Sequence, residues 1–112
     1  MYNARMARAS TSSDPFNAIA EPRRRHILEF LADRERSVGE IVDALELEQP
    51  SVSKHLQVLR RVDLVAARRD GRKIFYRTNG ETVRTIHAWS EMLVQRWRRQ
   101  LRQIKQHAEE TS

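Results

Sequence analysis

The stretch that decides the fold is QPSVSKHLQVLRR, residues 49–61. Its apolar residues Val52, Leu56 and Leu59 recur at i, i+4 and i+7, the spacing that places side chains on one face of an α-helix. The opposite face carries short polar and cationic side chains of the kind that reach base edges and phosphate oxygens. A purely structural surface helix more often carries Glu and Lys pairs there. The pattern therefore predicts an amphipathic helix whose polar face contacts DNA.

A second short helix is predicted directly before this stretch. Residues 37–40, Ser-Val-Gly-Glu, have the spacing of a capping box, in which the Ser37 hydroxyl accepts from the Glu40 amide and the Glu40 side chain reaches back. The helix continues to about Leu45, and residues 46–48 form a turn before the next helix. Two short helices joined by a tight turn constitute a helix-turn-helix.

Two further helices are predicted upstream. Asp14 precedes a proline and suits a helix N-cap, and Pro22 suits the first turn of the next helix. In that second helix the apolar residues Ile27, Leu28 and Leu31 are spaced to face the core, and Phe30 is a further candidate. Residues 1–13 mix arginine with serine and show no apolar period, so we expect a flexible arm. This arm either contacts the DNA backbone or is simply disordered.

A β-hairpin is predicted after the second helix of the pair, around Asp70-Gly71. Both residue types tolerate a positive φ, which two-residue hairpin turns require. Pairing across this turn is expected to place Val65 opposite Tyr76 and Ala67 opposite Ile74, giving an apolar face toward the helices. Cationic side chains crowd the tip, which indicates contact with the DNA backbone or a narrow minor groove. A solvated charged turn is the alternative.

The last and longest helix is predicted from about Gly80 to Ala108, with Asn79 as its N-cap. Its apolar stripe is too long for so small a domain to cover. Trp89 and Trp97 favour a protein interface, since aromatic residues supply much of the binding energy at interfaces, and a C2 homodimer would bury the stripe. Arginines along the polar side leave membrane-surface binding as the alternative. The residues expected at the dimer interface are Phe16, Ile86, Trp89, Leu93, Trp97, Leu101 and Ile104.

The composition limits the class of protein. A chain of 112 residues with 39% hydrophobic content forms one domain with a small core. The net charge of +6 and the pI of about 10.7 suit a polyanionic partner such as double-stranded DNA. No segment approaches the roughly 18 apolar residues of a membrane span. The N-terminus also lacks a hydrophobic signal region, so we expect a cytoplasmic protein with no membrane partner.

The same composition argues against catalysis. The chain has no cysteine, which excludes disulfides and thiolate metal sites. It has 3 glycines and no glycine-rich phosphate loop, and no nucleophile, base and acid can be assembled into a set. We expect no enzymatic activity and no cofactor. The expected fold is mainly α with a small β-hairpin, divided into an arm at 1–13, a winged helix-turn-helix core at 14–79 and a dimerisation helix with its tail at 80–112.

Three segments resemble the ArsR family of winged-helix repressors. FNAIAEPRRRHIL, residues 16–28, is similar to the family's opening helix, QPSVSKHL with Leu59 to its recognition helix, and residues 69–77 to its wing. The resemblance runs from Phe16 to Asn79. It implies a homodimeric bacterial transcription regulator, usually a repressor, that binds an inverted repeat. From the helix pattern and this resemblance together, the residues expected to contact DNA are Gln49, Ser51, Ser53, Lys54, His55, Gln57, Arg60, Arg61, Arg68, Arg69, Arg72 and Lys73.

The chain departs from the family where relatives sense metals. Cys-x-Cys pairs of metal-sensing relatives correspond to Ser37 and Gly39, which supply no thiolate. On the last helix His87 and His107 lie about five to six turns apart, and His87 has no regular acidic partner, so no metal site is expected. Glu48 stands where relatives often have a capping serine, which removes a cap hydrogen bond.

Two other functions remain open from the sequence. The first is a regulator of the same fold that senses a metal or a small molecule, whose identity the sequence does not give. The second is a helical module that binds an acidic partner or a membrane surface.

Overall fold

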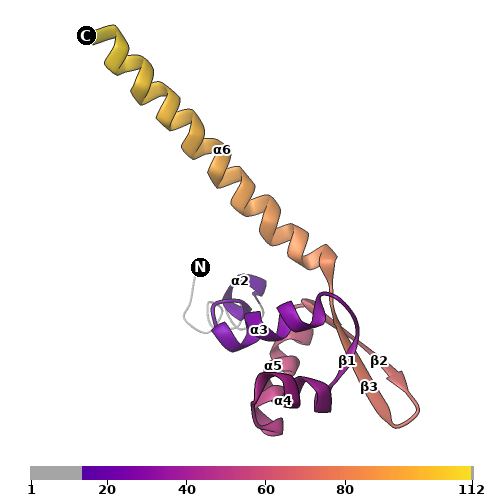
Figure 1. The fold of residues 1–112 in the computed structure, drawn as a ribbon. Coiled ribbons are helices and arrows are strands. Elements are labelled where there is room, and N and C mark those ends of the chain that lie inside the picture. Colours follow the sequence, from indigo (N-terminus) through magenta and orange to yellow (C-terminus); the bar gives the residue numbers. More distant parts are fainter. Residues whose placement is uncertain (1–13, 112) are drawn as a thin grey trace, which may run out of the picture. The chain divides into compact units, whose positions relative to one another are not determined.

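The computed structural model describes residues 14–111, which divide into one unit ending at Thr82 and a second beginning at Val83 (Figure 1). The predicted arm at 1–13 lies outside the described residues. The elements, in chain order, are α2 (Pro15–Ala18), α3 (Pro22–Leu31), β1 (Arg36–Ser37), α4 (Val38–Leu45), α5 (Gln49–Arg61), β2 (Val65–Asp70), β3 (Lys73–Thr78) and α6 (Gly80–Thr111).

The first two helices begin where the sequence predicts. The Asp14 carboxylate accepts a hydrogen bond from the Phe16 amide at 2.9 Å, and proline follows as the first helical residue. Glu21 caps α3 in the same way, accepting from the Arg23 amide at 3.0 Å. An acidic group at a helix N-terminus also faces the positive end of the helix dipole. The hydrogen bond from the Arg23 amide is the main cause that lowers the pKa of Glu21 from its ordinary 4.5.

Helices α4 and α5 form the predicted helix-turn-helix. Both bonds of the capping box are present: the Ser37 amide donates to Glu40 at 3.0 Å, and the Glu40 amide donates to the Ser37 hydroxyl at 3.3 Å. The C-cap of α4 is Glu46, whose φ of 54° and ψ of 41° are left-handed. Glu48 is the N-cap of α5 and makes no side-chain cap hydrogen bond, as expected for a glutamate at this position.

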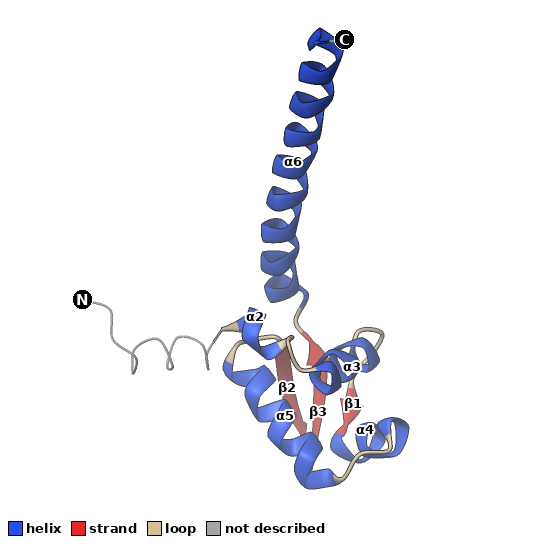
Figure 2. Ribbon diagram, turned by 90° about the vertical axis from the view of Figure 1, so that its left-hand side faces the viewer, coloured by secondary structure: helices blue, strands red, loops and turns tan. Residues whose placement is uncertain are grey.

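The core joins these helices to the hairpin. Helices α3 and α5 pack against the sheet (Figure 2). The largest fully buried side chains are Ile27, Leu31, Ile41, Val52, Leu56, Leu59 and Leu64. Each such side chain contributes about 1.5–3 kcal/mol on burial. The apolar edge of α5 is therefore fixed in the core, and its rotation about its own axis is set.

The sheet has three strands in the order β1-β3-β2, so β1 extends the predicted hairpin by a strand. Strand β1 was not expected, because two residues carry no periodicity. Its last residue, Ser37, is also the N-cap of α4, and an N-cap takes the extended conformation that strand pairing requires. The predicted architecture, mainly α with a small hairpin, is otherwise confirmed.

The predicted hairpin register is wrong by two residues. Val65 pairs with Thr78 and Ala67 with Tyr76, where the sequence suggested Tyr76 and Ile74 as their partners. The central turn positions are Gly71 and Arg72, and Gly71 has a φ of 63°, the geometry of a turn with glycine first. A shift of two residues leaves every side chain on the same face of the sheet. The apolar face therefore still points toward the helices.

Helix α6 begins where Asn79 accepts a hydrogen bond from the Glu81 amide at 3.2 Å, which confirms the predicted cap. The Asn79 amide group also donates to the Asp63 carbonyl at 2.9 Å. The helix ends at Thr111, and none of its residues is buried. Within residues 14–111 no helix has the length and apolar character needed to cross a bilayer.

Candidate nucleic-acid interface

The outer face of α5 carries the polar side chains that the sequence assigned to DNA contact. Because Val52, Leu56 and Leu59 are buried, the side chains on the other side point into solvent. The exposed residues are Gln49, Ser53, Lys54, Gln57, Arg60 and Arg61, whereas Ser51 and His55 are half-buried on the flanks. The helix thus presents amide, hydroxyl and cationic groups on one surface.

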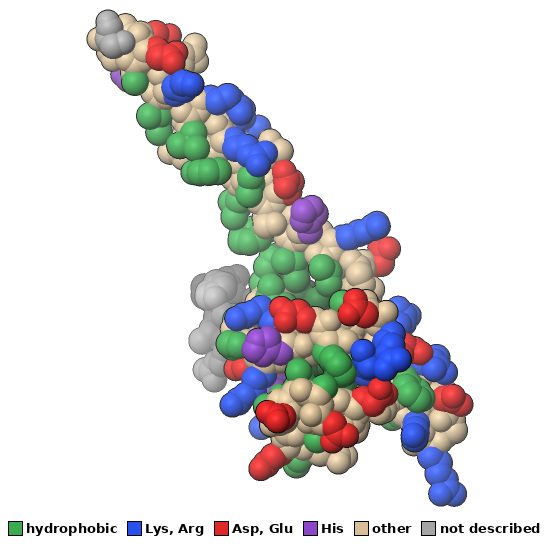
Figure 3. Space-filling view, viewed as in Figure 1, with side chains coloured by type: hydrophobic (Ala, Val, Ile, Leu, Met, Phe, Trp, Pro, Cys, Tyr) green, Lys and Arg blue, Asp and Glu red, His purple; other side chains and the backbone are tan. Residues whose placement is uncertain are grey.

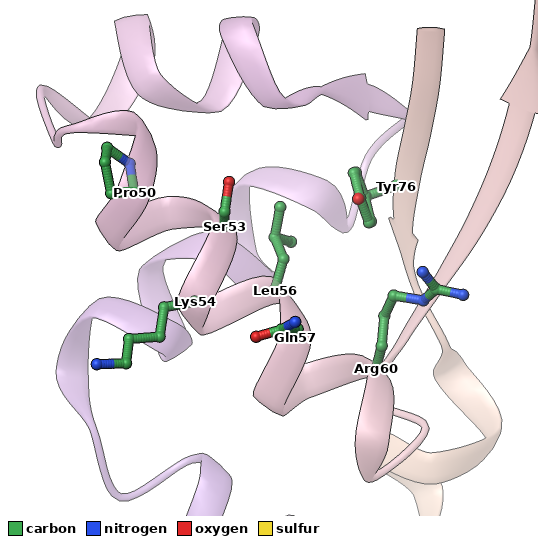
Figure 4. Close-up of a pocket in the computed structure, with 7 residues that line it drawn as sticks. All are labelled: Pro50, Ser53, Lys54, Leu56, Gln57, Arg60 and Tyr76. Atoms are coloured by element: carbon green, nitrogen blue, oxygen red, sulfur yellow. The ribbon is translucent and has the colours of Figure 1, made fainter. Parts of the chain in front are cut away.

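An open groove of about 490 Å³ runs between this face of α5 and the hairpin. It is lined by Pro50, Ser53, Lys54, Leu56, Gln57, Arg60 and Tyr76 (Figure 4). Tyr76 projects from β3 toward α5 in this view. Tyr76 was not among the residues predicted for this site, although its place on the apolar face of the hairpin could have indicated it.

A second open groove, of about 420 Å³, lies between the start of α4 and the hairpin tip. It is lined by Ser37, Val38, Gly39, Arg72, Lys73, Ile74 and Tyr76. Tyr76 lines both grooves, so the two grooves adjoin at this side chain. The exposed cations Arg69, Arg72 and Lys73 lie at that tip, and Figure 3 shows cationic side chains projecting from it.

Arg68 is placed differently from the other wing cations. Its guanidinium donates to both carboxylate oxygens of Glu35, from Nε to Oε2 at 3.0 Å and from Nη2 to Oε1 at 2.9 Å. It also lies 5.2 Å from the centre of the Phe75 ring. The hydrogen bond from Arg68 lowers the pKa of Glu35, and Glu35 in turn raises the pKa of Arg68. The structure therefore gives Arg68 an acidic partner within the chain.

His55 lies where α5 approaches the start of α3. Burial is the main cause that lowers the pKa of His55 below its ordinary 6.5, and the charge of Arg24 lowers it further. The Glu21 carboxylate acts in the opposite direction. The neutral imidazole is therefore favoured in the free protein, which makes His55 a neutral hydrogen-bonding group on this flank.

The arginine run at the start of α3 has a local role. Arg24 donates from Nε to the Ala18 carbonyl at 2.6 Å, and Arg25 donates from Nη1 to the Ile19 carbonyl at 2.6 Å. These carbonyls are at the end of α2, where helix geometry leaves them without amide partners. Residues 23–25 are all arginine, and their charges oppose the dipole at the start of α3. Two of these three arginines thus cap the preceding helix.

Helix α6 carries the predicted interface residues along one side, where Figure 3 shows hydrophobic side chains gathered. Trp97 is 57% exposed and Ile104 is 58% exposed, and Trp89, Leu93 and Leu101 are also exposed. Ile86 is half-buried. Phe16, the remaining predicted residue, belongs to α2 in the first unit and is half-buried there.

Among the described residues, no group of three His, Asp or Glu side chains is arranged to hold a metal ion.

Comparison with known proteins places this geometry in a family. Residues 21–67 match the model described as bacterial regulatory protein, arsR family. The transcriptional regulator KmtR of Mycobacterium tuberculosis is 46% identical over 71 residues, 63% of this chain and 55% of KmtR. The transcriptional repressor SdpR of Bacillus subtilis is 31% identical over 74 residues, 66% of this chain and 82% of SdpR. The chain spans only about half the length of several mycobacterial relatives.

A solved structure extends the similarity to most of the chain. The ArsR-like transcriptional regulator from Rhodococcus sp. RHA1 superposes with a TM-score of 0.72 at 29% identity. The superposition covers 89% of this chain and 93% of the Rhodococcus chain.

Proposed function

Because this chain belongs to the ArsR family of bacterial regulatory proteins and has its winged helix-turn-helix fold, we propose that it is a cytoplasmic transcriptional repressor that binds DNA. In this proposal it acts as a homodimer on an inverted-repeat operator. Membership of this family makes the chain a regulatory protein and not an enzyme. The similarity to SdpR, a transcriptional repressor, supports repression as the outcome of binding.

The observation that carries the proposal is the outer face of α5. Burial of Leu56 and its neighbours orients this helix, so that Lys54 and Gln57 extend from the solvent side into an open groove. The major groove of B-DNA admits an α-helix, and an amide side chain that reaches a base edge distinguishes base pairs there. A lysine beside it neutralises a phosphate. Helix α5 therefore serves as the recognition helix in our proposal.

The hairpin supplies a second contact in this account. Arg72 and Lys73 are exposed at its tip, next to the turn at Gly71. Cationic side chains at such a tip suit the phosphate backbone or a narrow minor groove, where the electrostatic potential is most negative. The two grooves that meet at Tyr76 support a single DNA-facing surface running from α5 to the tip.

The exposed stripe of α6 supports homodimerisation. A contiguous run of exposed Trp and Leu side chains on one helix is unfavourable in water and is the kind of surface that marks a protein interface. Two-fold symmetry would give each dimer two copies of α5, which matches the symmetry of an inverted repeat.

Sequencing of DNA fragments selected by the purified protein from a random library tests the function. We expect one enriched inverted repeat whose half-sites are about one helical turn, 10–10.5 base pairs, apart. Binding to all fragments alike would contradict sequence-specific regulation, and failure to bind any fragment at low salt would contradict DNA binding itself. A reporter gene placed behind the enriched site then distinguishes repression from activation.

A further inference from the structure

The hairpin has an inner face toward the helices and an outer face away from them. On the inner face Thr78 donates from its hydroxyl to the Leu28 carbonyl of α3 at 2.8 Å. Because side chains alternate along a strand, the pair Arg68 and Phe75 lies on the outer face. Strand β1 alternates in the same way: Arg36 stacks inward on Phe30 of α3, 4.3 Å from the ring centre. Its neighbour Glu35 therefore turns to the outer face.

Glu35, Arg68 and Phe75 form an anchor on that outer face. The Arg68 guanidinium binds the Glu35 carboxylate through two nitrogens, with Nη2 at 2.9 Å from Oε1, and its Cζ lies over the Phe75 ring. A bidentate pair of this kind fixes orientation as well as distance. Arg77 adds a further positive charge near Glu35. The anchor joins residues that are 33 positions apart in the chain.

The anchor links the wing to the helix-turn-helix. Glu35 directly precedes β1, and Ser37 at the end of β1 is the N-cap of α4. Arg68 is in β2, on the far side of β3 from β1. The ion pair therefore crosses the whole sheet and restrains the hairpin relative to α4. Strand β1 pairs only with Phe75 and Tyr76, so the hairpin is a two-stranded ribbon from there to its tip. Such a ribbon is weakly stable alone, and a modest restraint therefore changes the fraction of time that the tip spends in one orientation.

We propose that Glu35 and Arg68 are positioning residues that hold the wing against α4 in the orientation that binds DNA. In this proposal the DNA contacts of the wing come from Arg69, Arg72 and Lys73, and Arg68 acts through Glu35. The inference rests on the proposed DNA-binding function. It predicts that removal of an acidic residue weakens DNA binding, whereas loss of a negative charge ordinarily favours binding to a polyanion.

The substitution Glu35→Gln separates the two possible roles of Arg68. It keeps the size of the side chain, removes one negative charge and leaves Arg68 without its carboxylate. If Arg68 bound a phosphate directly, Glu35→Gln would release it toward DNA and tighten binding. If the pair positions the wing, Glu35→Gln should weaken binding about fivefold, the upper range for exposed pairs of good geometry. Affinity is measured by fluorescence anisotropy on the selected operator.

Asp33→Asn is the matched control. Asp33 is exposed in the same loop, and among the described residues it takes part in no ion pair. The substitution makes the same change in net charge two positions away and should leave affinity unchanged or slightly increased. Thermal unfolding of each variant verifies that the domain is folded.

The charge-swapped double variant, Glu35→Arg with Arg68→Glu, supplies the decisive readout. Each single reversal should weaken binding, and the double variant should recover most of the affinity because it restores an ion pair across the sheet. If Arg68 contacts DNA, the double variant stays weak, since Glu at 68 would repel a phosphate. That result, or unchanged or tighter binding by Glu35→Gln, would overturn the proposal. A wild-type protein that binds no DNA would instead reject the proposed function itself.

Discussion

Individual arginine side chains in this protein differ in what their guanidinium groups already contact. Arg24 and Arg25 donate to carbonyls at the end of α2, and Arg68 binds Glu35. Arg60 and Arg72 extend from exposed positions that line the two grooves. Sequence patterns identify all of them as cationic but do not separate those with partners inside the protein from those that line the grooves. The partner carbonyls and carboxylates come from other elements, so only the fold distinguishes the two groups.

His55 gives a pH-dependent prediction for the free protein. Since burial lowers its pKa below 6.5, the unfolded chain takes up a proton before the folded chain does. The free energy of unfolding should therefore fall as the pH drops below about 6.5 and level off once the folded His55 is also protonated. Urea titrations between about pH 7.5 and pH 5.5 measure this change.

Two substitutions assign that change to a residue. His55→Gln should flatten the pH dependence, whereas His26→Gln, at an exposed position of α3, should leave it in place. An unaltered slope in His55→Gln would show that another group is responsible.

Helices α4 and α5 were predictable because their signals are local. A capping box, an apolar spacing and a proline at the first turn all act within a few residues, so the sequence alone places the helices and the outward side of α5. Strand β1 was missed because its position depends on β3, far along the chain. The hairpin turn was identified but shifted, since Asp70 and Gly71 both tolerate a positive φ and only the structure shows that Gly71 comes first. The Glu35 anchor has no local signal.

The turn between α4 and α5 contains a backbone strain that can be relieved. Glu46 has a φ of 54°, which costs an ordinary L-residue about 1–2 kcal/mol relative to glycine. Because glycine adopts this conformation readily but loses more entropy on folding, we expect Glu46→Gly to stabilise the domain by about 0.5–1 kcal/mol. Glu46→Ala removes the same charge and keeps the strain. If both variants gain equally in urea unfolding, the effect is electrostatic and the backbone explanation is wrong.

The complete regulator, in this account, is a dimer that carries two recognition helices. A single chain of 112 residues buries limited apolar surface, so each protomer has a small core. The exposed stripe of α6 offers further apolar surface that a second chain can bury. The wing, the helix-turn-helix and α6 then serve separate purposes: orientation on the backbone, sequence readout and pairing of two chains.

The dimer is tested by Trp97→Glu, which places a charge in the exposed apolar stripe of α6. We expect sedimentation to give the monomer mass and operator affinity to fall by at least about tenfold, since a monomer contacts one half-site. Met92→Glu is the control, as Met92 is also exposed but lies on another side of the helix. A Trp97→Glu protein that sediments as a dimer would refute this interface.

The most direct test of the central claim, that α5 reads base edges, is the affinity of Gln57→Ala for the selected operator and for variants with each base pair changed. We predict that Gln57→Ala loses discrimination at one position in each half-site, by about 1–3 kcal/mol, and keeps it elsewhere. Lys54→Ala should weaken binding to all of these sequences alike and lower the salt slope by about one unit. Unchanged discrimination at every position in Gln57→Ala would contradict the assignment of Gln57 as a base-reading residue of α5.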